Sequence, residues 1–476
     1  MYDLVLQIGL VCSIVSFCLA TNTFTAAVYE HAIRSGKVES RSDALRIINK
    51  NLMVFTQQVA AAKMQGVDIL AFPEYGLTGS ITKYNPVLRS SAYLYAEKAP
   101  EPSSSEACMA CGPYPSNSDD WTVNHLCCLA QTNQMYLVAN LIEKQLTVNG
   151  SNLKLYNTNI IINSSGCIVS KYHKYHLYGD ESKLLDQPDH VEYSYTDTPF
   201  GRMGTLICYD LTFEEPALSL INTYQVDTLI LSTYWTLVYR STALYENIVE
   251  YASGWSRRMN VNFLAANIRD LKQHSFGSVI SSPEDIVDVY YQPHLTSGQL
   301  LVANLNKSSR HQVVSNDLSS PEPARAVEWS ELEHEGGVTY QVAQLKNLAD
   351  DIKVCHGTLC CSVSYRMNLT EDYIVLAAHQ SYSSSPYLEV CLLQTCKNES
   401  KSSCLDFPIS NGTTTFNYFV LSGNFSSAYA FPTVSGSGYS FIDITWQFSY
   451  DNHTNEIIVG EMSYPFLNAA IYTYFQ

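Results

Sequence analysis

The segment GTLICYDLTFEEPA, residues 204–217, joins an apolar run to a polar stretch, and a cysteine lies where the two meet. The apolar run predicts a buried strand and YDLTFEEPA the beginning of a helix, so Cys208 is expected at a strand-to-helix turn. Such a turn exposes a side chain, and the helix dipole there lowers the pKa of a thiol. Cys208 is therefore a candidate nucleophile, although an isolated cysteine is more often buried and inert.

Two further segments place charged side chains where predicted strands end. In AFPEYGLTG, Glu74 follows an apolar strand, and apolar neighbours should raise its pKa toward that of a general base near neutrality. In SKYHKYHLYGDE, Lys174 can supply positive charge to a developing oxyanion. The spacing of His173 and His176 fits neither a metal site nor a Cys–His pair, so we interpret both as structural or supporting residues. Taken singly, Glu74 is better explained as a helix N-cap and Lys174 as part of a solvated basic turn.

These segments lie in a region where strand-like and helix-like runs alternate, which predicts a layered α/β domain. Residues 41–65 carry apolar residues at helical spacing, with Ser42 as a possible N-cap and Gly66 as the stop. The predicted strands include FTAAVYEH (24–31), VDILAFPE (67–74), MYLVANLIEK, TNIIINSSGCIVSKYHK with a turn at Ser165-Gly166, VDTLILSTYW and NFLAAN.

After about residue 315 the pattern changes. SNDLSSPEPARAVEW is rich in Ser and Pro and is typical of a linker, and short β-type runs separated by Gly, Pro, Asn and Ser follow it. We therefore expect a catalytic domain over residues 21–315 and a smaller all-β domain over residues 316–476, preceded by a signal peptide at residues 1–20.

The signal peptide is predicted from LVLQIGLVCSIVSFCLA, an uncharged run that is short for a membrane span and ends at Ala20. A signal anchor is the alternative. Eight N-x-S/T triplets favour a glycosylated protein of the secretory pathway: Asn149, Asn163, Asn306, Asn368, Asn398, Asn411, Asn424 and Asn452. A glycolipid anchor requires a polar spacer followed by an apolar tail, and the C-terminal sequence does not show this pattern. We therefore expect soluble, extracellular secretion without stable membrane insertion.

The cysteine pattern favours disulfides. Of 14 cysteines, two would leave with the signal peptide, and six lie within about fifty residues from Cys355 to Cys404, which is typical of a small stapled domain. Cys108-x-x-Cys111 has the spacing of a zinc site, but the adjacent Cys127 and Cys128 fit disulfides better. Because setting Cys208 aside leaves an odd number, one more thiol should be free or pair between chains, and we predict Cys167.

The charge of the chain restricts its partners. The formal net charge is −17, from 28 Lys and Arg against 45 Asp and Glu. An acidic chain is a poor ligand for phosphate backbones and anionic membrane surfaces, so binding to nucleic acid is not expected.

Taken together, FPE, KYHKYHL and ICYDLTFEE resemble the three signature segments of the nitrilase (carbon–nitrogen hydrolase) superfamily, in their usual order. RRMNVNFLAAN around Asn267 and FGSVISSPEDI extend the match. CHGTLCCSVSYRM, YLEVCLLQTC and FVLSGNFSSAYAFP narrow it to the secreted vanin and biotinidase branch, whose members are pantetheinase-like amidases. The resemblance implies a four-layer αββα sandwich followed by a disulfide-rich all-β domain.

By position, the resemblance implies that Glu74 is the general base, that Lys174 stabilises the oxyanion and that Cys208 is the nucleophile. Glu181 would support them. It also implies a small-molecule amide substrate and no metal or organic cofactor. The expected reaction is hydrolysis of a linear amide through a cysteine thioester, most simply of pantetheine to pantothenate and cysteamine. The alternatives are a biotinidase-like amidase and a non-catalytic secreted glycoprotein; a papain-like protease lacks its cysteine signature here.

The chain departs from its branch after the nucleophile, where YDLTFEEPA replaces the FD-initiated segment typical of vanins. In STYWTLVYRS, the aromatic residues Tyr234, Trp235 and Tyr239 can form a pocket wall, with an equal chance of being core. We expect Tyr234, Trp235 and Asn267 to bind substrate. An added β domain can block the dimer surface of the superfamily, so we expect a monomer.

Overall fold

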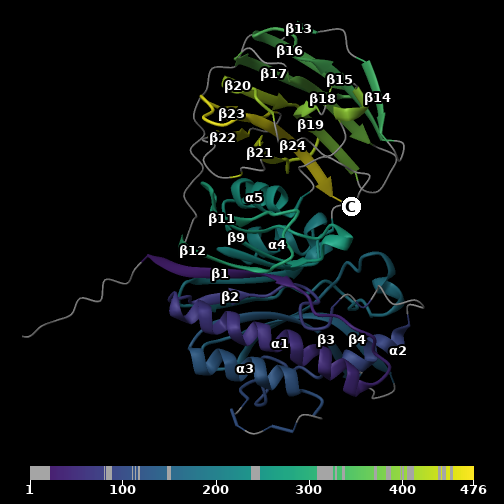
Figure 1. Ribbon diagram of the computed structural model, residues 1–476, viewed down its shortest axis with the longest axis vertical. Coiled ribbons are helices and arrows are strands. Elements are labelled where there is room, and N and C mark those ends of the chain that lie inside the picture. Colours follow the sequence, from purple (N-terminus) through teal and green to yellow (C-terminus); the bar gives the residue numbers. More distant parts are fainter. Residues whose placement is uncertain are drawn as a thin grey trace, which may run out of the picture.

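The computed structural model describes residues 22–476, except for 80, 82–87, 110, 113, 116–117, 147–151, 237–246, 308–324, 327–329, 335–337, 369–371, 382–386, 397, 399–400, 405–411, 438–440, 442–445, 451–453 and 476. The predicted signal peptide, most of the predicted linker, Tyr239 and three of the sequon asparagines (Asn149, Asn411 and Asn452) lie outside these residues. An α/β domain and an all-β domain are stacked along the long axis of the molecule (Figure 1).

The α/β domain contains one twelve-stranded sheet that folds into two halves, joined where β1 pairs with β9 at His31↔Ile268. Apart from antiparallel β12, the centre of each half is parallel, so several strands end at the same edge. The first half consists of β12 (Gln299–Asn306), β1 (Thr23–Ala32), β2 (Ile69–Ala71), β3 (Tyr136–Leu146), β4 (Leu153–Ile162) and β5 (Ile168–His173). The second consists of β9 (Asn262–Arg269), β8 (Thr228–Thr233), β7 (Gly201–Ile207), β6 (Tyr195–Thr198), β10 (Ser278–Ser281) and β11 (Ile286–Tyr290).

Helices cover the outer face of each half, which gives the αββα order (Figure 1). The inner faces share one apolar core, in which Val28 and Ile69 of the first half meet Ile230 and Leu264 of the second. The helices are α1 (Arg41–Met64), α2 (Arg89–Tyr95), α3 (Trp121–Asn133), α4 (Ala217–Asn222) and α5 (Ile248–Met259). The predicted fold class is therefore confirmed, because each half buries one face against the other and one against helices.

The predicted N-cap of α1 was wrong by two residues. Ser40, not Ser42, is the cap: its backbone is extended and its side chain accepts a hydrogen bond from the Asp43 N–H. Ser42 already lies in the first turn. Gly66 follows the end of the helix with a φ of 70°, a left-handed conformation that glycine adopts without a steric penalty.

The all-β domain is a sandwich of two six-stranded sheets around its own core. One sheet contains β13 (Arg325–Ala326), β16 (Ala349–His356), β17 (Leu359–Met367), β20 (Phe416–Gly423), β23 (Asn455–Val459) and β22 (Trp446–Tyr450). The other contains β14 (Ser330–His334), β15 (Val338–Gln344), β18 (Tyr373–Ser381), β19 (Tyr387–Cys396), β24 (Phe466–Phe475) and β21 (Phe431–Gly436).

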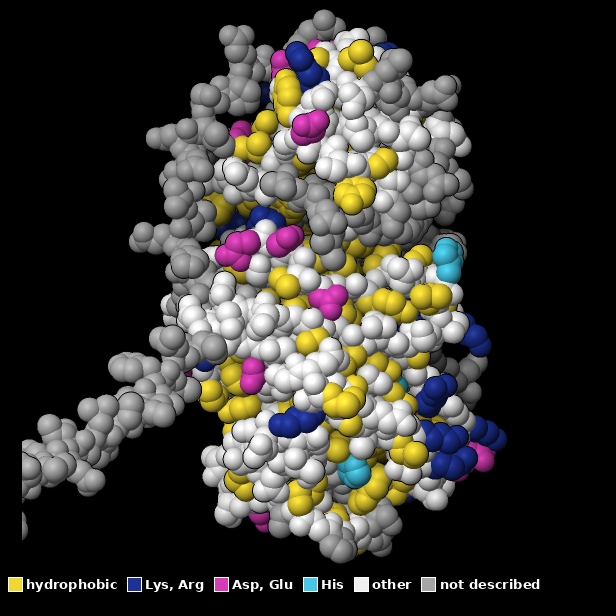
Figure 2. All heavy atoms as spheres, turned by 60° about the vertical axis from the view of Figure 1, so that its left-hand side comes forward, with side chains coloured by type: hydrophobic (Ala, Val, Ile, Leu, Met, Phe, Trp, Pro, Cys, Tyr) yellow, Lys and Arg dark blue, Asp and Glu magenta, His cyan; other side chains and the backbone are white. Residues whose placement is uncertain are grey.

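The two domains pack together through α5, which lies against β21 and β24. Trp255 stacks on Phe431 with ring centroids 4.6 Å apart. A side chain at Gly254 would meet the Pro432 carbonyl oxygen at 2.8 Å, so only glycine allows this approach. At the end of the helix the Arg257 guanidinium lies 3.9 Å from the Trp446 ring centroid. The furrow between the domains carries charged side chains of both signs on the face that Figure 2 shows.

Five disulfides are present among the described residues, and they correct one prediction. Cys167 is not free but pairs with Cys108, across an isolated β-bridge. The free thiol is Cys127, which points from α3 into the core, whereas its neighbour Cys128 faces the other way and bonds Cys111. No cluster of metal ligands is found in the described part of the chain, where no helix is long and apolar enough to cross a membrane either.

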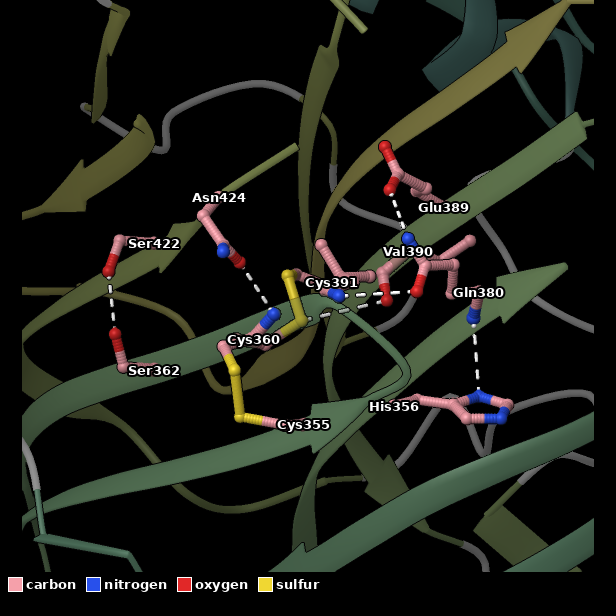
Figure 3. Close-up of a disulfide and its surroundings, with 12 residues drawn as sticks. Cys355, His356, Cys360, Ser362, Gln380, Glu389, Val390, Cys391, Ser422 and Asn424 are labelled. Carbon is pink, nitrogen blue, oxygen red and sulfur yellow. Dashed lines mark hydrogen bonds between the residues drawn. A yellow bond between two sulfur atoms is a disulfide. The ribbon is translucent and has the colours of Figure 1, made fainter. Parts of the chain in front are cut away.

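The six late cysteines form the expected bridges. Cys355–Cys360 closes the β16–β17 hairpin, and Cys396–Cys404 closes a short loop. Cys361, directly after Cys360, bonds Cys391 on β19 and so joins the two sheets across the core (Figure 3).

We predict that the inter-sheet bridge contributes more stability than the hairpin bridge. The loops closed are 30 and 5 residues, which corresponds to about 4 and about 2 kcal/mol of unfolded-state entropy. Thermal unfolding should therefore show a larger loss for Cys361→Ala/Cys391→Ala than for Cys355→Ala/Cys360→Ala. Equal losses would show that the bridge does not hold the sheets together.

Candidate active site

A pocket of about 450 Å³ lies at the edge where β2, β5, β7 and β8 end. The carboxyl ends of strands are where open α/β folds usually place their sites. All four residues predicted for the reaction line this pocket. Its lining is Glu74, Tyr75, Lys174, Tyr178, Gly179, Asp180, Glu181, Cys208, Tyr234, Thr236 and Gln273.

Glu74 follows β2 and is 1% exposed. Its Oε1 accepts hydrogen bonds from Lys174 Nζ and from Asn157 Nδ2, both at 2.8 Å, and its Oε2 accepts one from the Tyr234 N–H at 2.9 Å. Burial raises the pKa of this carboxyl from 4.5 to about 7, although the Lys174 ammonium opposes the shift. The prediction of a general base near neutrality is consistent with this environment.

Lys174 follows β5 and lies between two carboxylates. Its Nζ donates to Glu74 Oε1 and to Glu181 Oε2, each at 2.8 Å, and the side chain is 1% exposed. Burial alone would lower the pKa of this ammonium, but the two carboxylates outweigh burial and raise it well above its usual value. Lys174 is therefore charged at neutral pH.

Glu181 lies in a short 3-10 turn, Gly179–Lys183. Besides Lys174, its carboxylate accepts hydrogen bonds from the Tyr178 N–H at 2.7 Å, from the Tyr75 hydroxyl and from Asn157 Nδ2 at 3.2 Å. The sequence-based prediction of a second carboxylate beside the lysine agrees with this geometry.

Cys208 is the first residue of a 3-10 turn, Cys208–Thr212, and has a φ of 47°. A left-handed backbone at a residue other than glycine costs about 1–3 kcal/mol and is concentrated at functional sites. Asp210 holds the turn, because its Oδ2 accepts the Ile207 N–H at 3.3 Å and its Oδ1 accepts the His176 N–H at 2.8 Å.

The expected effect of a helix dipole on Cys208 was wrong. The turn is too short to act as a helix, and α4 begins only at Ala217. Burial, and then the nearby Glu74 carboxylate, raise the pKa of the thiol well above its usual value, while Lys174 opposes the shift. The thiol at rest therefore keeps its proton and needs a base to remove it.

The two histidines, His173 and His176, are held by carboxylates outside the pocket. His173 is held between Glu143 and Glu192, 3.0 Å from each; burial would lower its pKa, but these carboxylates raise it to about 9. His176 Nδ1 lies 3.0 Å from Asp210 Oδ1. Neither is among the residues that line the pocket.

Of the three expected substrate-binding residues, only Tyr234 lines the pocket. Its hydroxyl donates to Asp270 Oδ2 at 2.7 Å. The Trp235 ring packs against Tyr251, with centroids 5.3 Å apart, and belongs to the core side of the loop. Asn267 is fully buried, and its Oδ1 accepts the Trp235 N–H at 2.9 Å, so it holds the loop after β8.

The sequence analysis missed Tyr75 and two asparagines of the adjacent strands, Asn140 and Asn157. Tyr75 adjoins a predicted residue and has a φ of 55°. Asn157 interrupts the apolar strand β4, and a polar residue at a core position is itself a signal of a specific partner. No local pattern identifies that partner, because Glu74 is 83 residues away in the sequence.

We predict that Lys174→Met lowers the free energy of unfolding by about 3–5 kcal/mol, because it leaves two buried carboxylates without a cation. Urea unfolding should show part of this loss recovered in Lys174→Met/Glu181→Gln. The control is Lys183→Met, which removes an exposed pair with Asp180 and should change stability by less than about 0.5 kcal/mol. Equal stability of Lys174→Met and Lys183→Met would contradict this role of Lys174.

Comparison with known proteins identifies the family of the chain. The family model described as carbon–nitrogen hydrolase matches residues 31–248, and the vanin C-terminal domain matches residues 331–474. Pantetheinase from Mus musculus is 31% identical over 87% of this chain and 81% of its own length. Pantetheinase from Homo sapiens is 31% identical, with 88% and 83% covered, and biotinidase from Takifugu rubripes is 30% identical, with 88% and 87% covered. The chain therefore belongs to the vanin and biotinidase family of carbon–nitrogen hydrolases, which act on amide bonds other than peptide bonds.

Proposed function

We propose that the protein is a secreted amidase that hydrolyses pantetheine to pantothenate and cysteamine, with Cys208 as nucleophile. The observation that carries the proposal is the shared pocket of Cys208 and Glu74, in which the carboxylate is also bonded to Lys174. Similarity to pantetheinases from several mammals supports the choice of substrate. A biotinyl amide is the second candidate, because a biotinidase is similar over as much of the chain.

The proposed reaction has two halves. Glu74 takes the proton of the Cys208 thiol, and the sulfur attacks the amide carbonyl carbon to form a tetrahedral oxyanion beside the Lys174 ammonium. The C–N bond then breaks, and the amine leaves with the proton held by Glu74. In the second half, Glu74 takes a proton from water and the hydroxide attacks the thioester carbonyl carbon. The C–S bond then breaks, and the Cys208 sulfur takes back the proton held by Glu74. A charged Lys174 and a carboxylate that titrates near neutrality suit these roles.

The rim of the pocket is polar. Tyr178, Asp180, Thr236 and Gln273 contribute hydroxyl, carboxylate and amide groups to the lining. A volume of about 450 Å³ is within the range of small-molecule sites. Pantetheine carries hydroxyl and amide groups along its acyl chain, so this rim offers it more hydrogen bonds than it would offer an apolar chain.

Extracellular localisation is part of the proposal. Five disulfides favour an oxidising compartment. Of the described sequon asparagines, Asn306, Asn368, Asn398 and Asn424 are exposed, as acceptors of glycans must be. We also propose the domain limits 21–315 and 316–476, and a monomer, since the β domain covers the outer face of α5.

Assays of the secreted protein on pantetheine and biocytin test the substrate. We expect the kcat/KM for pantetheine to exceed that for biocytin by at least about tenfold, which corresponds to about 1.4 kcal/mol in the transition state. Cys208→Ala should abolish both activities while it remains folded. A higher kcat/KM for biocytin than for pantetheine would identify the protein as a biotinidase-like amidase. Full activity of Cys208→Ala would overturn the mechanism.

The pH dependence of kcat/KM tests the base. Glu74 must be ionised to accept the thiol proton, and its pKa is raised to about 7, so activity should fall as the pH drops through 7. An ordinary carboxylate would give an acid limb near 4.5. A limb below pH 5, in a protein that circular dichroism shows to be folded, would contradict the raised pKa of Glu74 on which this prediction rests.

A further inference from the structure

We infer that Asn157 is a positioning residue of this site: its side-chain amide spans Glu74 and Glu181 and fixes both carboxylates around Lys174. Its Nδ2 donates to Glu74 Oε1 at 2.8 Å and lies 3.2 Å from Glu181 Oε1 and from the Tyr75 hydroxyl. The significance for catalysis rests on the proposed role of Glu74 as the base.

The orientation of the Asn157 amide is fixed by the backbone. The Tyr75 N–H can only donate, so the side-chain atom of Asn140 that it meets at 2.9 Å must be the carbonyl oxygen. The NH₂ group of Asn140 therefore points to Asn157, where it donates to Oδ1 at 2.7 Å. This interaction turns the NH₂ group of Asn157 toward the two carboxylates.

The same row of amides reaches the strand of the nucleophile. Asn140 on β3 pairs with Asn159 on β4, and Asn157 lies two residues away on the same face. Asn140 donates to Asn159 Oδ1 at 3.0 Å, and Asn159 donates to Thr205 Oγ1 at 2.9 Å and to the Leu206 carbonyl at 3.3 Å. Thr205 and Leu206 belong to β7, which ends directly before Cys208.

Burying these amides lowers the stability of the fold unless each of them is hydrogen-bonded. The three asparagines are 1% exposed or less. A buried amide without partners costs about 1–3 kcal/mol of stability, and apolar residues at these positions would carry no such desolvation cost. The row therefore serves the geometry of the site: it connects the base, the second carboxylate and the strand of the nucleophile through donors that carry no charge.

The chemical consequence concerns the base. Asn157 is a neutral donor to the ionised form of Glu74 and so lowers its pKa against the effect of burial. Without this donor, Glu74 would hold its proton to a higher pH. Of the side chains that the structure describes, Lys174 would then be the one still bonded to Glu74 Oε1.

The test compares Asn157→Ala with the wild-type protein by two pH profiles, that of kcat/KM for pantetheine and that of the alkylation rate of Cys208 by iodoacetamide. In alkylation the thiolate displaces iodide, and mass spectrometry identifies the modified peptide. We expect kcat/KM at pH 7 to fall by about tenfold or more, and the acid limb of both profiles to move to higher pH.

Ser170→Ala is the control, since it removes a buried hydroxyl on β5 whose hydrogen-bond partners, the Ser194 hydroxyl at 2.6 Å and the Tyr195 carbonyl oxygen, lie outside the carboxylate cluster. It should leave the acid limbs in place. If Asn157→Ala does not fold, Asn157→Ser is used, because one short hydroxyl cannot span both carboxylates. Unmoved acid limbs in the folded Asn157 variant would overturn the inference. An inactive wild-type protein on pantetheine and biocytin would instead refute the proposed substrates, and the alkylation profile would still decide the role of Asn157.

Discussion

One ammonium held between two buried carboxylates is the constraint on which the site depends. Taking three charges out of water costs several kcal/mol for each ion, and only short, well-directed contacts compensate this cost. Lys174 makes two such contacts, each 2.8 Å long, to Glu74 and Glu181. The ends of β2 and β5 and the turn at residues 179–183 must therefore stay fixed to within a fraction of an ångström, which the packed αββα layers provide.

The same cluster explains why Cys208, as the proposed nucleophile, needs a base. Counting one positive and two negative charges, the cluster is already net negative, and a thiolate would add a further negative charge to this buried group of side chains. The proton of Cys208 and the proton that Glu74 can hold are thus coupled. Moving one proton between the two groups keeps the net charge constant. In the proposed mechanism, the positive charge of Lys174 then faces the negative charge that develops on the substrate.

Much of this site could be predicted from the sequence, because its charged residues lie at strand ends in segments with recognisable patterns. Glu74, Lys174, Glu181 and Cys208 all line one pocket, as expected. What failed depended on three-dimensional surroundings. The thiol of Cys208 is governed by burial and by Glu74 rather than by a helix dipole, and the identity of the second free thiol, Cys127 and not Cys167, depends on which side of α3 faces the core. The row of asparagines could not be predicted for the same reason, since its members contact one another and Thr205 only when β3, β4 and β7 have folded together.

The central claim is that hydrolysis proceeds through an acyl thioester on Cys208. Its most direct test is rapid acid quenching of a single turnover of pantetheine with enzyme in excess, followed by mass spectrometry of the peptides. The account predicts that the peptide containing Cys208 gains the mass of the pantothenoyl group and loses it as the acid product appears. An acyl group on another side chain, with Cys208 unmodified throughout turnover, would contradict it.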